Sequence, residues 1–312
     1  MTANRHIDPR SAAQLKIADT SGAHSGPALD IDRCALLACV LEVSAAKPGN
    51  VHPGARFEDV TFDDFVASAA AIAPAMREAR QIGVGAAVLR AIRATRSVVG
   101  TNTNLGTVLL LAPLAAVPPE LPLAEGVAEV LARLTADDAR DVYRAIHLSQ
   151  AAGLGNVAEM DVAGPPPDDL VAAMRIAAER DLVARQYAEN YFHVFQWLVP
   201  WLMEGQAAGW TLDHAIVWTH VKLMSQIPDS LIARKCGSEI AQESAERAAS
   251  VLTAGKPGGP PWNAALANLD AWLRADGNRR NPGTTADLIA AALFAALREG
   301  KIAPPREGEY AS

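Results

Sequence analysis

The sequence lacks the features that are typical of several common classes of binding protein. Its 312 residues carry a formal net charge of −7 and contain no basic tract. We therefore expect no nucleic-acid partner, because binding to nucleic acid through a broad electropositive face depends on many phosphate contacts. An anionic small molecule is compatible with this charge if a local cluster of cations or backbone N–H groups receives it.

Cysteine is also scarce. The chain has three thiols, and none of them forms a Cys-x-x-Cys pair. Cys34 and Cys39 are five residues apart and would point to different sides of a helix, and Cys236 is distant from both. We interpret all three as small buried hydrophobic residues in a reducing compartment.

Long apolar runs are missing as well. The run VLLLAPLAAV at 108–117 is too short to span a bilayer and contains a proline. The first 28 residues are polar, with Asp8, Arg10 and Asp19 among them, which does not fit a signal peptide. We expect a soluble cytoplasmic protein that has no membrane partner, in which residues 1–28 form a loose tail.

Sustained alternation of apolar and polar residues, the mark of half-buried strands, is absent. Apolar residues recur instead at helical spacing, and the abundant alanine favours helix and permits close helix contacts. Half of the residues are hydrophobic and a fifth are charged, which excludes wholesale disorder. We predict an all-α fold in a single multi-helix domain over 29–303, followed by a C-terminal tail at 304–312.

Capping residues and proline or glycine turns set the expected helix boundaries. Thr61 with Asp64, and Thr135 with Asp138, have the spacing of a capping box. The stretch GPPPDD at 164–169 indicates a linker. The predicted helices cover 31–44, 61–80, 82–97, 105–116, 135–152, 170–193, 194–204, 212–226, 237–253, 262–274 and 284–298.

Polar residues gather between the predicted helices in five places. The first is KPGNVH at 47–52, just after Glu42. Its Pro-Gly pair forces a turn, which would present three polar side chains together: Lys47, Asn50 and His52. The alternative is an exposed turn without a role in binding or catalysis.

The second place is GTNTNLG at 100–106, directly before an apolar helix. The free N–H groups and partial positive charge of a helix N-terminus can hold a phosphate. The stretch lacks the lysine of a P-loop, and the alternative is an elaborate helix cap. The candidate phosphate contacts here are Asn102, Thr103, Asn104 and Gly106.

The third place is acidic. Asp137 and Asp141 are one helical turn apart and would share a helix face. Mg²⁺ prefers oxygen ligands and commonly lies between carboxylates and substrate phosphates. For each of these acids the alternative is helix capping. The whole set is Asp59, Asp63, Asp64, Asp137, Asp138 and Asp141.

The last two places lie in the C-terminal third. In IPDSLIARKCG, Asp229 is placed to cap a turn, and Arg234 and Lys235 are adjacent cations of the kind that pair with phosphates. In NPGTTADL, Asp287 falls in the first turn of a predicted helix. Capping alone would account for that aspartate.

In series, these places resemble the triphosphoribosyl-dephospho-coenzyme A synthase family over roughly 31–298. The shared pattern is Glu-Val-Ser…Lys-Pro-Gly-Asn-Val, an aspartate, Gly-Thr-Asn-Thr-x-x-Gly, Asp-Ser…Arg-Lys-x-Gly and Asn-Pro-Gly-x-x-Ala-Asp-Leu. The resemblance implies an all-α fold. It also implies attack by the 2′-hydroxyl of 3′-dephospho-CoA on C1′ of the ribose of ATP, with loss of adenine. The product is the precursor of the prosthetic group of citrate lyase and malonate decarboxylase.

The resemblance also implies site residues. Carboxylates would stabilise positive charge at C1′ or accept the hydroxyl proton, and Mg²⁺ and cations would hold the triphosphate. The expected catalytic residues are Glu42, Lys47, Asp59 and Asp229. The resemblance adds substrate contacts at Gly49, Asn102, Thr103, Gly106, Arg234, Gly237 and Gly283, and the polar places themselves add Asn50, His52, Asn104 and Lys235. The expected Mg²⁺ ligands are Asp59, Asp229 and Asp287, together with Asp137 and Asp141 from their shared helix face.

The sequence departs from the family pattern at three points. His52 replaces an aspartate, Asn104-Leu105 replaces His-Lys, and Arg56 replaces the histidine of Gly-Ala-His. The acceptor could therefore be a precursor of a pterin-linked one-carbon cofactor instead of dephospho-CoA. A non-catalytic helical binding protein on the same fold is a further alternative. An oligomer is compatible with the sequence.

Overall fold

The computed structural model describes residues 29–149 and 167–303. Regular structure in these ranges is helical, apart from one isolated bridge between His52 and Ala55. The predicted all-α class is confirmed. Four predicted segments lie outside the described residues, wholly or in part: the tails 1–28 and 304–312, the end of the predicted helix 135–152, and the start of the linker 164–169.

Most predicted helices are present with nearly the predicted ends. The elements are α1 (Ile31–Ser44), α2 (Phe62–Ile82), α3 (Val84–Val98), α4 (Leu105–Ala116), α5 (Leu123–Ala132), α6 (Ala136–Ser149), α7 (Leu170–Ala177), α8 (Leu182–Ala188), the π-helix η1 (Val194–Leu198), α9 (Val199–Ala207), α10 (Leu212–Gln226), α11 (Ser230–Cys236), α12 (Ser238–Thr253), α13 (Pro260–Arg274) and α14 (Gly283–Arg298).

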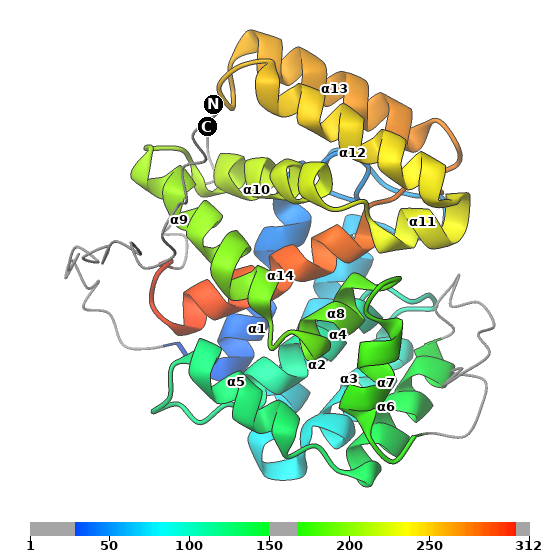
Figure 1. The fold of residues 1–312 in the computed structure, drawn as a ribbon, viewed down its shortest axis with the longest axis vertical. Coiled ribbons are helices and arrows are strands. Elements are labelled where there is room, and N and C mark those ends of the chain that lie inside the picture. Colours follow the sequence, from blue (N-terminus) through cyan, green and yellow to red (C-terminus); the bar gives the residue numbers. More distant parts are fainter. Residues whose placement is uncertain (1–28, 150–166, 304–312) are drawn as a thin grey trace, which may run out of the picture.

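Helix α14 is the centre of the fold and crosses the middle of the molecule (Figure 1). Every residue from Leu288 to Leu297 is buried. A helix that is apolar on all sides has to be surrounded by other elements. It is in contact with α1, α4, α8, η1, α9, α10 and α11.

The helices outside this set lie towards two ends of the molecule. Helices α2, α3, α5 and α6 lie together at the lower end of the molecule in Figure 1, and α12 and α13 lie side by side at the upper end. No helix in the two described ranges is long and apolar enough to cross a membrane.

One predicted helix is wrong, and two short helices were not predicted. The predicted single helix 170–193 is broken: α7 ends at Ala177, and Asp181 caps a new helix by accepting hydrogen bonds from Val183 N and Ala184 N at 2.8 and 3.0 Å. A capping aspartate competes with a continuous helix because its side chain takes the free N–H groups. The two helices that the sequence analysis missed are α5 and α11, both short.

A proline inside α4 fixes how the neighbouring chain packs. Pro113 has no N–H group, so the carbonyl of Leu109 one turn earlier lacks its usual helical partner. The buried hydroxyl of Tyr187 donates to that carbonyl at 2.7 Å, and Tyr191 donates to Leu110 O at 2.9 Å. These two bonds secure α8 and the chain after it against α4.

The contact between α3 and α6 provides a test of the packing. A Cβ added at Gly85 would lie 2.4 Å from both Cα and O of Asp138. We predict that Gly85→Ala lowers the free energy of unfolding by about 1–3 kcal/mol, because α3 and α6 would have to separate. Urea unfolding measures this. Gly100→Ala is the control, since a Cβ at Gly100 meets nothing within 4 Å, and equal values for the two variants would contradict the packing.

Candidate active site

A cavity of about 1200 Å³ opens at the N-terminal end of α14. Its wall comes from α1, α2, α4, α6, α7, α8, α11 and α14 and from the loops between them. The first residues of α14 are polar, in contrast to the rest of that helix. Of the predicted site residues, those on the cavity wall are Glu42, Asn50, Asp59, Asn102, Thr103, Asn104, Gly106, Arg234, Lys235, Gly283 and Asp287.

The KPGNVH turn is held firmly from behind by α13 and the loop after it. Gly49 has φ +75°, and a Cβ there would lie 2.9 Å from Leu273 and Pro282, so only glycine fits. The N–H of Gly49 donates to Asp270 Oδ1 at 2.7 Å. Asn50 Nδ2 donates to Asn281 Oδ1 at 2.7 Å. The turn is therefore a fixed part of the interior.

The turn carries its lysine inwards. Lys47 is completely buried, and its Nζ lies 2.9 Å from Oε1 of Glu42 in the last turn of α1. Glu42 is nearly buried and lines the cavity, whereas Lys47 does not. The expectation that Lys47 acts directly on the substrate as a catalytic residue does not fit this position. Gly49 and His52 also lie outside the cavity wall.

The GTNTNLG loop is braced by its own polar side chains. Asn104 pairs with Thr95 of α3 through both of its amide atoms, at 3.1 and 3.2 Å. Thr103 Oγ1 lies 2.6 Å from Ser68 Oγ on α2. Asn102 Oδ1 accepts from the N–H of Leu105 at 3.2 Å and so caps the start of α4. These bonds hold the loop in shape, and they occupy groups that the sequence analysis assigned to phosphate.

Asp287 is the carboxylate that this loop approaches most closely. A Cβ at Gly106 would lie 2.1 Å from Asp287 Oδ2, so glycine is required for the contact. Thr107 Oγ1 donates to Asp287 Oδ1 at 2.6 Å. The pKa of Asp287 is raised from 3.8 to about 7: burial is the largest cause, the Thr107 bond lowers the pKa, and nearby carboxylates, Glu42 first among them, add to the rise. Asp287 can therefore gain or lose a proton near neutral pH.

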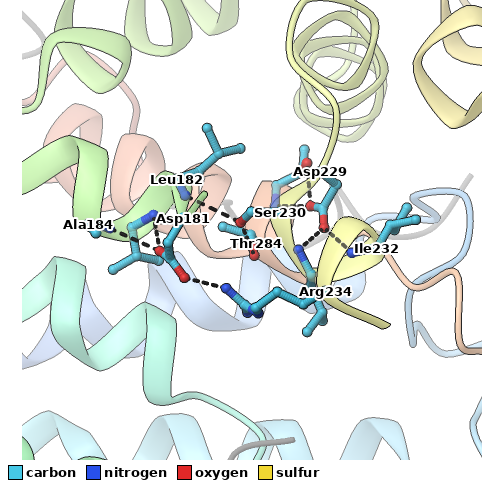
Figure 2. A network of polar contacts seen from close by, with 11 residues as sticks. Asp181, Leu182, Ala184, Asp229, Ser230, Ile232, Arg234 and Thr284 are labelled. Atoms are coloured by element: carbon cyan, nitrogen blue, oxygen red, sulfur yellow. Dashed lines mark hydrogen bonds and ion pairs between the residues drawn. The ribbon is translucent and has the colours of Figure 1, made fainter. Parts of the chain in front are cut away.

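A group of cations faces the same cavity. Arg234 of α11 pairs with Asp181 at the start of α8, as Figure 2 shows. Lys235 follows it, and the Lys235 carbonyl accepts a hydrogen bond from Arg279 at 2.8 Å. No carboxylate in the described ranges lies within 4 Å of Lys235 or Arg180. We call Arg180, Arg234, Lys235 and Arg279 the cation group; all four line the cavity.

Asp229 joins α11 to α14 and is not on the cavity wall. Its Oδ1 accepts from Leu231 N and Ile232 N at 2.8 and 3.1 Å. Its Oδ2 accepts from the N–H and the hydroxyl of Thr285, at 2.7 and 2.8 Å. The residue is 1% exposed, so the predicted role in catalysis or metal binding does not fit its position. Figure 2 shows Ser230 bridging the same helices through Thr284.

The remaining predicted residues lie elsewhere. Asp137 and Asp141 are absent from the cavity wall and pair with Arg140 and Arg144 on their own helix. Their predicted role as metal ligands is therefore not supported by their positions. Gly237 has φ +94° and joins α11 to α12, also outside the cavity. Within the part of the chain that the structure describes, no group of three or more His, Cys, Asp or Glu side chains could hold a metal ion.

Several wall residues were not predicted from the sequence. They include Thr107, Arg180, Arg279 and Asn281. Asn281 is the first residue of the recognised Asn-Pro-Gly motif, although it was not named as a site residue, and Arg279 lies two residues before it. Arg180 had no such signal, because the break between α7 and α8 was missed. Cys39 also lines the wall, but burial raises the pKa of its thiol and keeps it protonated.

The comparisons with known proteins agree on one family. Residues 28–305 match the family model described as ATP:dephospho-CoA triphosphoribosyl transferase. The crystal structure of a proposed triphosphoribosyl-dephospho-CoA synthase from Archaeoglobus fulgidus is similar, with 29% identity and a TM-score of 0.59, covering 75% of this chain and 99% of that one. No curated protein matches the chain.

The raised pKa of Asp287 predicts how stability depends on pH. Because its pKa is higher in the folded protein than in the unfolded chain, the folded state loses stability as pH rises from about 4 to about 7. Asp287→Asn removes this loss. We predict that the free energy of unfolding of this variant, relative to that of the wild type, rises by roughly 1–4 kcal/mol as the pH goes from about 4 to about 8.

Urea unfolding at the two pH values measures this difference. The control is Asp213→Asn, which changes an exposed aspartate in the first turn of α10. For this control the change relative to the wild type should stay below about 1 kcal/mol. A gap between Asp287→Asn and the wild type that does not vary with pH would contradict the raised pKa.

Proposed function

The chain belongs to the family of ATP:dephospho-CoA triphosphoribosyl transferases (CitG), and on that premise we propose that it transfers the 5-triphosphoribosyl group of ATP to the 2′-hydroxyl of 3′-dephospho-CoA and releases adenine. The observation that carries this proposal is one cavity that combines the carboxylates of Glu42 and Asp287 with the cation group. Transfer of a triphosphoribosyl group needs both: cations for the phosphates and carboxylates for the carbon that reacts.

The cation group is the proposed site of the triphosphate. Arg234 and Lys235 are adjacent, and Arg279 donates to the Lys235 carbonyl. Arg180 directly precedes Asp181, the ion-pair partner of Arg234. Lys235 and Arg180 have no carboxylate partner within 4 Å in the described ranges, so their charge is available to a ligand. Arginine and lysine bind phosphate oxygens through charge-assisted hydrogen bonds.

The carboxylates are the proposed site of the ribose. Loss of adenine develops positive charge at C1′, and a carboxylate nearby stabilises that charge electrostatically. We assign this role to Glu42, whose Oε1 lies 2.9 Å from the Lys47 ammonium. Asp287 has the pKa that suits a group exchanging protons near neutral pH, and we assign it as the base.

In the proposed reaction, one bond forms and one bond breaks at C1′ of the ribose. The 2′-hydroxyl oxygen of dephospho-CoA forms a bond to C1′ of the ribose, and its proton passes to the Asp287 carboxylate. The C1′–N9 bond breaks, and adenine leaves with that electron pair. Adenine then takes up one proton, so the return of the proton from Asp287 restores the carboxylate for the next turnover. The triphosphate stays on the ribose throughout.

Mg²⁺ enters this proposal with the nucleotide. The described residues contain no metal cage of three or more ligands, but Mg²⁺ is usually held by one or two carboxylates together with substrate phosphates. Asp59 is an exposed carboxylate on the cavity wall, and we assign it to this ion. Bound there, Mg²⁺ would neutralise part of the triphosphate charge.

The positions of the sequence departures support dephospho-CoA as the acceptor. His52 lies outside the cavity wall, where its Nδ1 accepts from Gly54 N at 3.1 Å. Arg56 is exposed and also outside the wall. Only the Asn104-Leu105 departure is on the wall, and Asn104 is engaged with Thr95. Two of the three departures therefore have no direct contact with an acceptor.

Release of free adenine tests the proposed function. We predict release that requires ATP, Mg²⁺ and dephospho-CoA together and stops when EDTA is added. Asp287→Asn should slow it by roughly 10²- to 10⁴-fold, the range typical of a lost general base. Chromatography of the reaction measures adenine and the new nucleotide. Release with a pterin precursor in place of dephospho-CoA would contradict the proposed acceptor, and no release with either would contradict the reaction.

The assignment of the cation group predicts a defect in ATP binding. Lys235→Ala should raise KM for ATP by roughly 10- to 100-fold, because a charge-assisted hydrogen bond is worth about 1.5–3 kcal/mol and about 1.4 kcal/mol corresponds to a factor of ten. Lys256→Ala is the control, since Lys256 is exposed and outside the cavity. The same KM for both variants would exclude Lys235 from the triphosphate site.

A further inference from the structure

The first residue of KPGNVH has an unusual environment for a lysine in a turn. Lysine is among the residue types least often fully buried, yet Lys47 has 0% exposure. Its ammonium carries three donors. Each has an acceptor: Oε1 of Glu42 at 2.9 Å, the backbone carbonyl of Glu42, and the carbonyl of Ala45 at 3.3 Å. No donor remains for a substrate phosphate.

The ion pair of Lys47 with Glu42 has no competitor in the described ranges. Glu42 is the one carboxylate there within 4 Å of the ammonium. His220 on α10 is completely buried, and neither of its ring nitrogens has a hydrogen-bond partner. Burial lowers the pKa of His220, and the charge of Lys47 lowers it further, so the imidazole is neutral. The lysine therefore neutralises Glu42 alone.

The surrounding turn prevents the lysine from leaving this position. Gly49 is wedged against Leu273 and Pro282, and its N–H is bound to Asp270. Arg274 donates to the carbonyl of Asn50. Before Pro48, the N–H of Lys47 donates to the carbonyl of Ala45 at 2.7 Å. With the chain held on both sides of Pro48, Lys47 cannot turn towards the cavity without loss of these contacts.

We infer that Lys47 is a positioning residue, whose buried ammonium orients the Glu42 carboxylate at the cavity wall and balances its charge. This inference builds on the proposed function, in which Glu42 faces C1′ of the ribose. A buried carboxylate that loses its only ion-pair partner either takes up a proton or rotates towards water. Both changes would remove the negative charge from the reacting carbon, and neither would affect the triphosphate site.

The test compares Lys47→Met, Glu42→Gln and the double variant. We expect Lys47→Met to lower kcat by about 100-fold and to leave KM for ATP within about twofold, because the lost interaction acts only in the transition state. Glu42→Gln should show the same pattern. The double variant should be no slower than Glu42→Gln alone, since two residues that act as one unit are not additive. Calorimetry of ATP binding should give the same affinity for all of them.

Lys222→Met is the matched control. Lys222 is also paired with a glutamate, with Nζ 3.7 Å from Glu204, but it lies outside the cavity, between the rings of Trp201 and Trp218. Its loss should leave kcat and KM within about twofold of the wild type. Thermal melts of every variant separate a loss of activity from a loss of folded protein.

Three results would overturn the inference. The first is a kcat for Lys47→Met equal to that of the wild type. The second is ATP binding by Lys47→Met that is about tenfold weaker, which would place the ammonium on the phosphates. If Lys47→Met does not fold, the double variant is the test, because it contains no lone buried charge. Weaker ATP binding by the double variant than by Glu42→Gln would be the third. Absence of adenine release from the wild type would contradict the proposed function instead, and calorimetry would still test Lys47.

Discussion

The hydrophobic surface of α14 is the constraint on which the rest of the structure depends. Its residues from Leu288 to Leu297 are buried on every side, so the helix has to be enclosed by seven other elements. Enclosure of the apolar part leaves the polar first turns, with Thr284, Thr285 and Asp287, inside the molecule as well. Polar groups at such depth need partners. Asp229 and Thr107 supply some of them, and the cavity lies where the apolar packing stops.

Two carboxylates meet at this point from opposite ends of the chain. Asp287 arrives with α14, and Glu42 arrives with the last turn of α1, which packs on α14. Carboxylates so close to each other repel, and the structure handles the two differently. Glu42 has the buried ammonium of Lys47 at 2.9 Å, whereas Asp287 accepts from the hydroxyl of Thr107 and has a pKa near 7. One carboxylate thus has its charge balanced by an ammonium, and the other is able to exchange a proton.

The sequence predicts much of the fold, because helical spacing and caps are local properties of the chain. The sequence does not predict side-chain positions that depend on contacts between residues far apart in the chain. The burial of Lys47 depends on Asp270 and Arg274, more than 200 positions later, and a Pro-Gly turn ordinarily indicates the surface. The spacing of Asp137 and Asp141 predicts a shared helix face but not the direction of that face. The order of the motifs nevertheless indicated Glu42 and Asp287, since a shared site constrains them together.

We propose that ATP binds in this cavity with its ribose at Glu42 and Asp287 and its triphosphate at the cation group. A crystal structure of the Asp287→Asn variant with ATP, Mg²⁺ and dephospho-CoA would test this binding mode. We expect C1′ beside Glu42 and phosphate oxygens within hydrogen-bond distance of Arg234 or Lys235. Nucleotide bound elsewhere, such as the smaller hollow between α5 and α7, or bound with its triphosphate at the carboxylates, would contradict it.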